Sequence, residues 1–248
     1  MHKRLLSGVV IALLSVCILL SPWYIQLGSC VLLMLMMLHE LANMHSHALN
    51  KVLVWPLSCL LLAIIYYNPY LIELIVLTGV LIRFVLMLRD QKILQVFWGL
   101  ALLDIAMFGY SLLLMMQTTW LLAATVTLIA GIDVFGYYIG KRFGTKRIIV
   151  WVSPNKTLEG YMGGMLWLLL VGVILVIWVD APIKLLVYNF MTLYTLAVLG
   201  DLFMSFLKRQ VRVKDTGSLI PGHGGVLDRV DSWLLVVPWV YLFYAMGN

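Results

Sequence analysis

Long runs of apolar residues, separated by short polar connections, make up most of this 248-residue sequence. A helix needs roughly 17 to 25 mainly apolar residues to cross the hydrocarbon core of a membrane. Nine segments approach or meet this length, at about 5–23, 27–44, 52–67, 70–88, 94–116, 119–140, 160–179, 183–206 and 232–247. The pattern predicts an all-α, polytopic integral membrane protein with about nine transmembrane helices.

The composition supports a membrane protein. Hydrophobic residues make up 63% of the chain and charged residues 11%, and the mean hydropathy is +1.03, which excludes an ordinary water-soluble domain. No linker, low-complexity stretch or internal repeat divides the sequence. We therefore expect a single membrane-embedded domain over 1–248, with N-terminal spans in 1–130 and the spans that carry the long polar loops in 131–248.

The positive charges predict the orientation. Almost all of the 17 Lys and Arg residues lie before the first predicted span or after the second, fourth, sixth and eighth; the exceptions are Arg83 and Lys184. Cytoplasmic connections of membrane proteins are enriched in Lys and Arg, so this distribution predicts a cytoplasmic N-terminus. The net charge of +6 then faces one membrane surface, where it meets anionic lipid headgroups, and indicates no nucleic-acid partner.

Two acidic residues lie where predicted spans lead into the two longest basic loops. Asp133 is near the end of the span at 119–140, and Asp201 is near the end of the span at 183–206. Ionisable groups in spans are costly and usually face the protein interior or a watery cavity. We expect both carboxylates to point to the same place, and they are the weaker candidates for binding a metal.

The basic loop between the spans at 183–206 and 232–247 holds groups suited to metal and phosphate. It includes the stretch KDTGSLIPGHGGVLDRVDS at 214–232. Carboxylate oxygens suit magnesium, and the candidates are Asp215, Asp228 and Asp231. Cationic side chains suit phosphates, and the candidates are Lys208, Arg209, Lys214 and Arg229. Backbone N–H groups freed by glycine can surround an anion, and the candidates are Gly222, Gly224 and Gly225. Composition alone leaves two interpretations open: a phosphoryl- or nucleotidyl-transfer site, or a solvated loop with surface ion pairs.

The other long basic loop follows the span at 119–140 and ends where the span at 160–179 begins. Ser153 starts a turn, and Thr157 flanks the entry to the helix, whose N-terminal N–H groups could bind an anion. Lys156 could hold a lipid phosphate, or it could be one more cation that sets the orientation. These three residues are candidates for substrate binding.

The run HELANMHSH at 39–47 superficially resembles a zinc-protease helix. That motif needs two histidines four residues apart, whereas His39 and His45 are six apart. The run, with Glu40 and His47, is interpreted as a short interfacial loop after the second span, with metal binding as the minor alternative.

Several elements together resemble one family. SFLKR at 205–209 is followed by KDTG at 214–217, PGHGG at 221–225 and DRVD at 228–231, which resembles the signature of the phosphatidate cytidylyltransferases (CDP-diacylglycerol synthases). SPNKTLEG at 153–160 and DVFGYYIGKRFG at 133–144 resemble further elements of that family, with Gly136 where alanine is expected. The resemblance is strong over 133–231 and generic before it.

The resemblance implies a polytopic membrane enzyme that joins CTP to phosphatidic acid, with Mg²⁺ required. The lack of an organelle signal and the compact length lead us to expect the bacterial inner (cytoplasmic) membrane. The product is CDP-diacylglycerol and the by-product is pyrophosphate. A second, monovalent cation and a homodimer are left open. By motif position, the carboxylates of Asp215, Asp228 and Asp231 bind metal or act in catalysis, together with Lys214 and His223. The cations at Lys208, Arg209 and Arg229 contact phosphates.

Two alternatives remain at this point. The same chemistry could act on another lipid phosphate, such as a polyprenyl or ether lipid, because nothing in the sequence determines the tail. The chain could also be a non-catalytic membrane binder or transporter of phosphorylated ligands with the same fold, although the complete set of acidic residues favours the enzyme.

Overall fold

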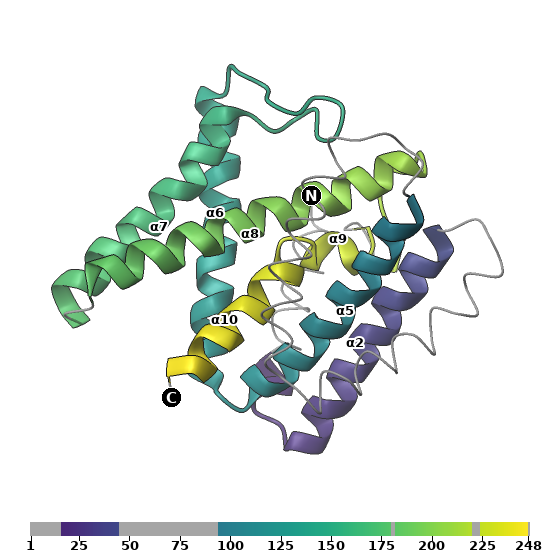
Figure 1. Cartoon of the computed structure of the whole chain (residues 1–248), viewed down its shortest axis with the longest axis horizontal. Helices are drawn as coiled ribbons and strands as arrows, with labels where there is room; N and C mark the ends of the chain where they lie inside the picture. The colour runs from purple at the N-terminus through teal and green to yellow at the C-terminus, as the bar shows by residue number, and fades with distance from the viewer. Residues whose placement is uncertain (1–15, 45–93, 180–181, 220–223, 248) are drawn as a thin grey trace.

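The structure is a computed structural model that describes residues 16–44, 94–179, 182–219 and 224–247 (Figure 1). Within these ranges the regular secondary structure is helical, apart from isolated bridge residues at Gly224 and in the pair Arg147 and Thr157. The helices are α2 (Trp23–Met44), α5 (Leu94–Met116), α6 (Thr119–Phe143), α7 (Leu158–Val179), α8 (Ile183–Gln210), α9 (Leu227–Val230) and α10 (Trp233–Gly247).

The expected all-α membrane architecture is confirmed for the described residues. Four helices are long and apolar enough to cross a membrane: α2, α6, α8 and the Leu158–Trp178 part of α7. Shorter apolar stretches lie in α5 and α10. The predicted spans at 52–67 and 70–88 lie outside the described residues. The chain is a multi-pass membrane protein.

The boundary between the first two predicted spans was wrong. The first was expected to continue to residue 23 and the second to begin at 27, but Trp23 is already the first residue of α2. The helical turn at 16–19 ends before Pro22, whose carbonyl accepts the N–H groups of Ile25 and Gln26 at 3.0 and 3.2 Å. Proline has no N–H to donate to a preceding turn, so it separates the two helices and starts the second.

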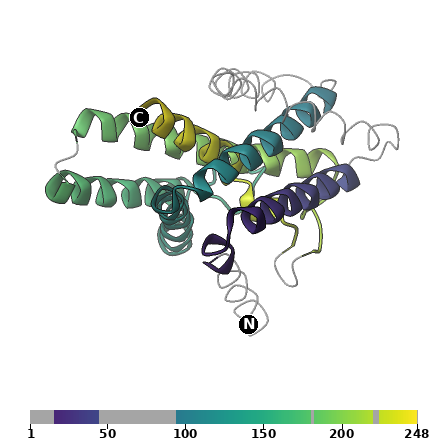
Figure 2. The same ribbon diagram turned by 90° about the horizontal axis from the view of Figure 1, so that it is seen from below.

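Two groups of helices meet along α8. On one side α5 packs against α2 and α10; on the other, α6 packs most extensively against α7 (Figures 1 and 2). Buried apolar side chains of α2, α5 and α8, among them Met37, Phe108 and Phe203, form the larger core. A second core joins α5, α6, α7, α8 and α10 around Ile129 and Leu168. The long helix α8, like α5 and α10, therefore contributes to both cores.

Glycines allow α6 and α7 to approach closely at the loop end. A Cβ on Gly160 would lie 3.0 Å from the Gly136 carbonyl oxygen, and one on Gly140 would lie 3.2 Å from the Gly160 Cα. The expected alanine at position 136 would also be tight, because its Cβ would lie 3.2 Å from the Gly160 carbonyl oxygen. This contact holds the start of α7 against the end of α6.

Candidate functional site

A cavity of about 580 Å³ lies between α6, α7 and α8, beside the connection 144–157. Its polar lining includes the two carboxylates predicted near the ends of spans, Asp133 from α6 and Asp201 from α8. The expectation that they point to the same place is therefore confirmed. Lys156 also lines the cavity and forms an ion pair with Asp201. Ser153 and Thr157 complete the set of predicted residues in this wall.

The connection 144–157 is fixed at both ends. The Thr145 hydroxyl donates to Glu159 Oε1 at 2.5 Å, and the Lys146 N–H donates to the same carboxylate at 3.2 Å. Thr157 caps α7, because its hydroxyl oxygen accepts the N–H of Gly160 at 3.2 Å. These bonds occupy part of the helix N-terminus that had been expected to bind an anion, and they hold Lys156 over the cavity.

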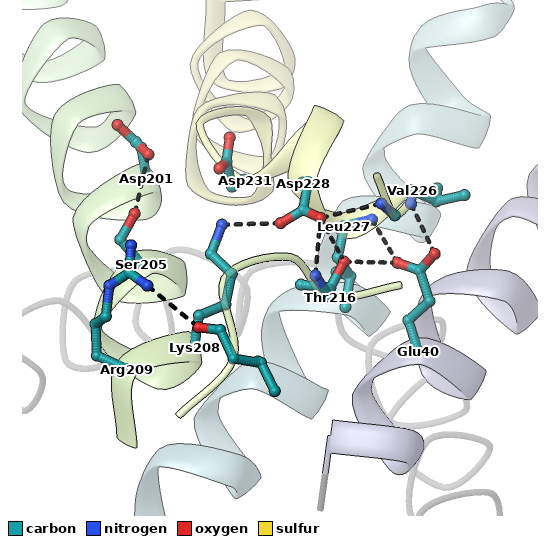
Figure 3. A network of polar contacts seen from close by, with 12 residues as sticks. Glu40, Asp201, Ser205, Lys208, Arg209, Thr216, Val226, Leu227, Asp228 and Asp231 are labelled. Atoms are coloured by element: carbon teal, nitrogen blue, oxygen red, sulfur yellow. Dashed lines mark hydrogen bonds and ion pairs between the residues drawn. The ribbon is translucent and has the colours of Figure 1, made fainter. Parts of the chain in front are cut away.

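Asp228 is the centre of a buried polar network (Figure 3). Its Oδ1 accepts Lys208 Nζ at 2.8 Å, and both side chains are largely buried. Its Oδ2 accepts the N–H groups of Thr216 at 2.8 Å and Gly225 at 3.0 Å. Burial by itself would raise the pKa of Asp228, but Lys208 and the two N–H groups outweigh it and hold that pKa below its ordinary value.

Asp231 lies between this network and the cavity. Gly200 of α8 makes its position possible, because a Cβ there would be only 2.6 Å from the Asp231 carbonyl oxygen. The next residue, Ser232, lines the cavity. Burial raises the pKa of Asp231, and the nearby charge of Asp228 adds to this, while Lys208, the Ser232 N–H and Lys156 act in the opposite direction. Asp231 therefore interacts electrostatically with both parts of the site.

Lys156 is affected by burial as well. Burial lowers the pKa of Lys156, and the charge of Lys208 acts in the same direction, whereas the charges of Asp231 and Asp133 raise it. Lys208 is poorly solvated, whereas the Lys156 side chain is 39% exposed at the cavity. Each lysine is paired with a carboxylate, and Asp133 and Asp231 add further negative charge, so an added anionic group would need another cation there.

Glu40 joins the site from α2, and sequence reasoning missed it. It lies inside α2 rather than in an interfacial loop, and it is buried with 2% of its surface exposed. Its carboxylate accepts the N–H groups of Val226 at 2.8 Å and Leu227 at 2.9 Å, and the Thr216 hydroxyl at 2.9 Å. The only signal for it in the sequence was an acidic residue within an apolar run.

Residues 2–246 match the sequence model of the cytidylyltransferase family. The chain belongs to the cytidylyltransferase family. A phosphatidate cytidylyltransferase of Bacillus subtilis is 40% identical over 116 residues, covering 46% of this chain and 43% of the relative. One of Thermotoga maritima is 36% identical over 141 residues, covering 54% and 48%. An Escherichia coli relative, named Uncharacterized protein YnbB, is 33% identical over 160 residues, covering 60% and 52%. The matched part is about half the length of each relative.

In this cytidylyltransferase-family chain, the remaining predicted residues are placed as follows. The side chain of Asp215 is exposed, and a Cβ on Gly224 would lie 3.6 Å from its Cβ and 3.0 Å from Asp228 Oδ2. Arg209 connects the two loops by donating to the carbonyls of Val152 and Val213, both at 3.3 Å. The other two predicted cations, Lys214 and Arg229, are exposed. Gly222 and His223 lie outside the described residues.

The Gly225 N–H has a different partner from the one expected in the cytidylyltransferase loop. It was predicted to help surround a phosphate, but in the structure it donates to Asp228. The next two N–H groups, of Val226 and Leu227, donate to Glu40. This stretch of backbone is therefore held by the protein's own carboxylates.

Proposed function

We propose that this chain transfers the cytidylyl group of CTP to phosphatidic acid, forming CDP-diacylglycerol and pyrophosphate. The observation that carries the proposal is the family match over residues 2–246, in a chain whose Lys208–Asp228 pair lies beside a cavity lined by Lys156 and Asp201. Relatives named phosphatidate cytidylyltransferase share 36% and 40% identity with it over the matched stretches, which supports the same substrate class.

The chemistry requires little from a base. A phosphate oxygen of the lipid attacks the α-phosphorus of CTP; the new P–O bond forms as the bond to the bridging oxygen breaks, and pyrophosphate leaves with the electron pair. The barrier comes from bringing two anions together and from the charge that develops on the leaving group. Lys156, partly exposed at the cavity, and Lys208, buried and held by Asp228, supply fixed positive charge that offsets part of this negative charge.

Magnesium is part of the proposal. Among the described residues, no group of three or more His, Cys, Asp or Glu side chains is already gathered as a metal site. The donor chemistry nevertheless fits, because Asp133 and Asp201 bring carboxylate oxygens to the cavity and Asp231 adjoins it. Bound Mg²⁺ would neutralise phosphate charge. Asp215 and Asp228 are the further candidates from the motif, and a second, monovalent cation stays a prediction.

The proposed site also needs access from two phases. We propose nine spans with a cytoplasmic N-terminus in the bacterial inner membrane, which would place the connections 144–157 and 211–226 on the side where CTP is found. The lipid tails would remain in the bilayer beside α6, α7 and α8, whose outward residues include exposed Leu169, Val173 and Tyr188.

The test is direct. The purified full chain in lipid nanodiscs is incubated with radiolabelled CTP, Mg²⁺ and phosphatidic acid, and the lipid phase is analysed for label. Label in CDP-diacylglycerol is expected. A parallel assay uses polyprenyl phosphate in place of phosphatidic acid, and label in the lipid phase of that assay alone would contradict the proposed substrate. CTP binding without transfer to either lipid phosphate would favour a binding protein.

A pair of lysine variants makes the assay specific. Lys156→Met should reduce turnover by about 100-fold, because it removes a positive charge from the cavity at little change in side-chain length. Lys184→Met removes an exposed lysine from the start of α8 and should leave turnover unchanged. Equal activity of the two variants would contradict the role of Lys156.

A further inference from the structure

Glu40 occupies an unusual position for a carboxylate. It is buried in the first described long helix, and its three hydrogen bonds reach residues 176 to 187 positions away in the chain. All three donors are neutral: two backbone N–H groups and one hydroxyl. Burying a carboxylate is costly unless its oxygens are well satisfied, so this contact is a specific feature of the fold.

The bonds of Glu40 connect directly to those of Asp228. The Thr216 hydroxyl lies 2.9 Å from Glu40 Oε2 and 3.1 Å from Asp228 Oδ2, so it bridges the two carboxylates. Glu40 accepts the N–H groups of Val226 and Leu227, while Asp228 accepts the N–H of the preceding residue, Gly225. Three successive amides are thus divided between the two side chains (Figure 3).

Two glycines of the loop leave room for Glu40. A Cβ on Gly217 would lie 2.9 Å from Glu40 Oε1 and 3.1 Å from its Cδ. One on Gly225 would lie 2.5 Å from Glu40 Oε2. The absence of side chains at these positions lets the loop close around the carboxylate, which explains two of its glycines without a phosphate.

We infer that Glu40 is a positioning residue: it anchors the loop from α2 and thereby sets where Asp228 holds Lys208. It contacts neither the cavity nor Lys208, so it acts through Thr216 and the amides of residues 225–227. The consequence for turnover rests on the proposed cytidylyl transfer, whereas the anchoring itself does not. Helix α2 thereby becomes a part of the site's support.

The test compares Glu40→Gln with Gln26→Leu in the full chain. Gln26 is a second buried polar residue of α2, and it donates to the carbonyls of Leu19 and Ser21, at the helix end away from Glu40. In Glu40→Gln an NH₂ group replaces one acceptor and faces backbone donors. Hydrogen exchange followed by mass spectrometry should show the amides of residues 224–228 exchanging about tenfold faster in this variant only.

Turnover supplies the second measurement. Glu40→Gln should lower kcat by roughly 10- to 100-fold with KM for CTP near the wild-type value, as expected for a residue that supports those that act on substrate. Unchanged exchange in Glu40→Gln would overturn the anchor. Faster exchange with normal kcat would overturn the positioning role. If the wild-type chain transfers no cytidylyl group, the proposed function fails, and the exchange data still decide whether Glu40 anchors the loop.

Gly217→Ala covers the case in which Glu40→Gln does not fold. It should accelerate exchange of the same amides, because its Cβ would crowd the Glu40 carboxylate. Gly28→Ala is the control, because its Cβ would meet nothing within 4 Å, and it should leave that exchange unchanged. Unchanged exchange in Gly217→Ala, or equal acceleration in the two variants, would also overturn the anchor.

Discussion

At the scale of single residues, the site depends on buried carboxylates whose oxygens accept several hydrogen bonds from the protein itself. Asp228 accepts an ammonium group and two backbone N–H groups, and it is buried together with Lys208. Removing one member of a buried pair leaves the other charged and unsatisfied, which costs more than the pair itself contributes. Asp228 therefore has a structural role in addition to any role toward substrate.

This gives a stability prediction with a defined pH dependence. Asp228→Asn should lower the stability of the protein at pH 7 by about 3–5 kcal/mol, because Lys208 loses its buried partner. The folded-state pKa of Asp228 is depressed, so the stabilisation is complete above the ordinary carboxyl pKa and is lost as pH falls through the lower, folded value. Thermal unfolding in detergent should show the wild type and the variant converging below about pH 4.

Asp215→Asn is the matched control for that measurement. Asp215 belongs to the same loop but is exposed, so its substitution should change stability by less than about 0.5 kcal/mol at any pH. A loss of stability in Asp215→Asn as large as that in Asp228→Asn would contradict the assignment of the effect to the buried pair.

At the scale of elements, the end of α8 directs the loop toward the site. The N–H of Val213 donates to the Lys208 carbonyl at 2.9 Å and that of Arg212 to the Arg209 carbonyl at 3.1 Å. This is the Schellman pattern, and it requires a left-handed residue, which here is Arg212 with φ 59°. The turn reverses the chain within a few residues and brings Thr216 to Asp228.

Glycine should fit this helix end better than arginine. A non-glycine residue in the left-handed region is strained, and we expect Arg212→Gly to raise stability by about 0.5–1 kcal/mol. Arg212→Ala removes the same charge but keeps a Cβ, so it should produce no such gain. The thermal midpoints of the two variants at one pH measure the difference, and equal midpoints would assign the effect to charge.

At the scale of the whole molecule, α8 couples a larger core to the pair formed by α6 and α7. The cavity lies beside the part of α8 that carries Asp201, and the Asp228 network lies beside the part that carries Lys208. Since α7 and α8 are consecutive helices that are each long enough to cross a membrane, the connection before α7 and the connection after α8 should lie on the same side of it.

Cysteine labelling tests this arrangement. Single cysteines are introduced at three exposed positions, Ile148, Lys184 and Ser218, in a variant without the natural cysteines. Positions 148 and 218 should react with a membrane-impermeant thiol reagent from the same side of sealed vesicles, and position 184 from the other. Labelling of all three from one side would show that α7 and α8 do not both span the membrane.

The sequence by itself determined the helical membrane class and most helix bounds, because the length of an apolar run is a local property that the bilayer selects directly. It also located Lys208 and Asp228, which belong to a spaced motif, and Asp201, an acidic residue near the end of an apolar run. The helix break at Pro22 was missed because the apolar pattern continues across it.

Only the tertiary structure decided which groups satisfy one another. Glu40 and the loop it holds are separated by more than 170 residues, and local spacing carries no information about that contact. The same is true of Gly200, whose missing side chain admits the backbone of Asp231. A buried carboxylate must be matched by donors from whichever elements pack around it, so its partners follow from the packing of helices and not from its neighbours in the chain.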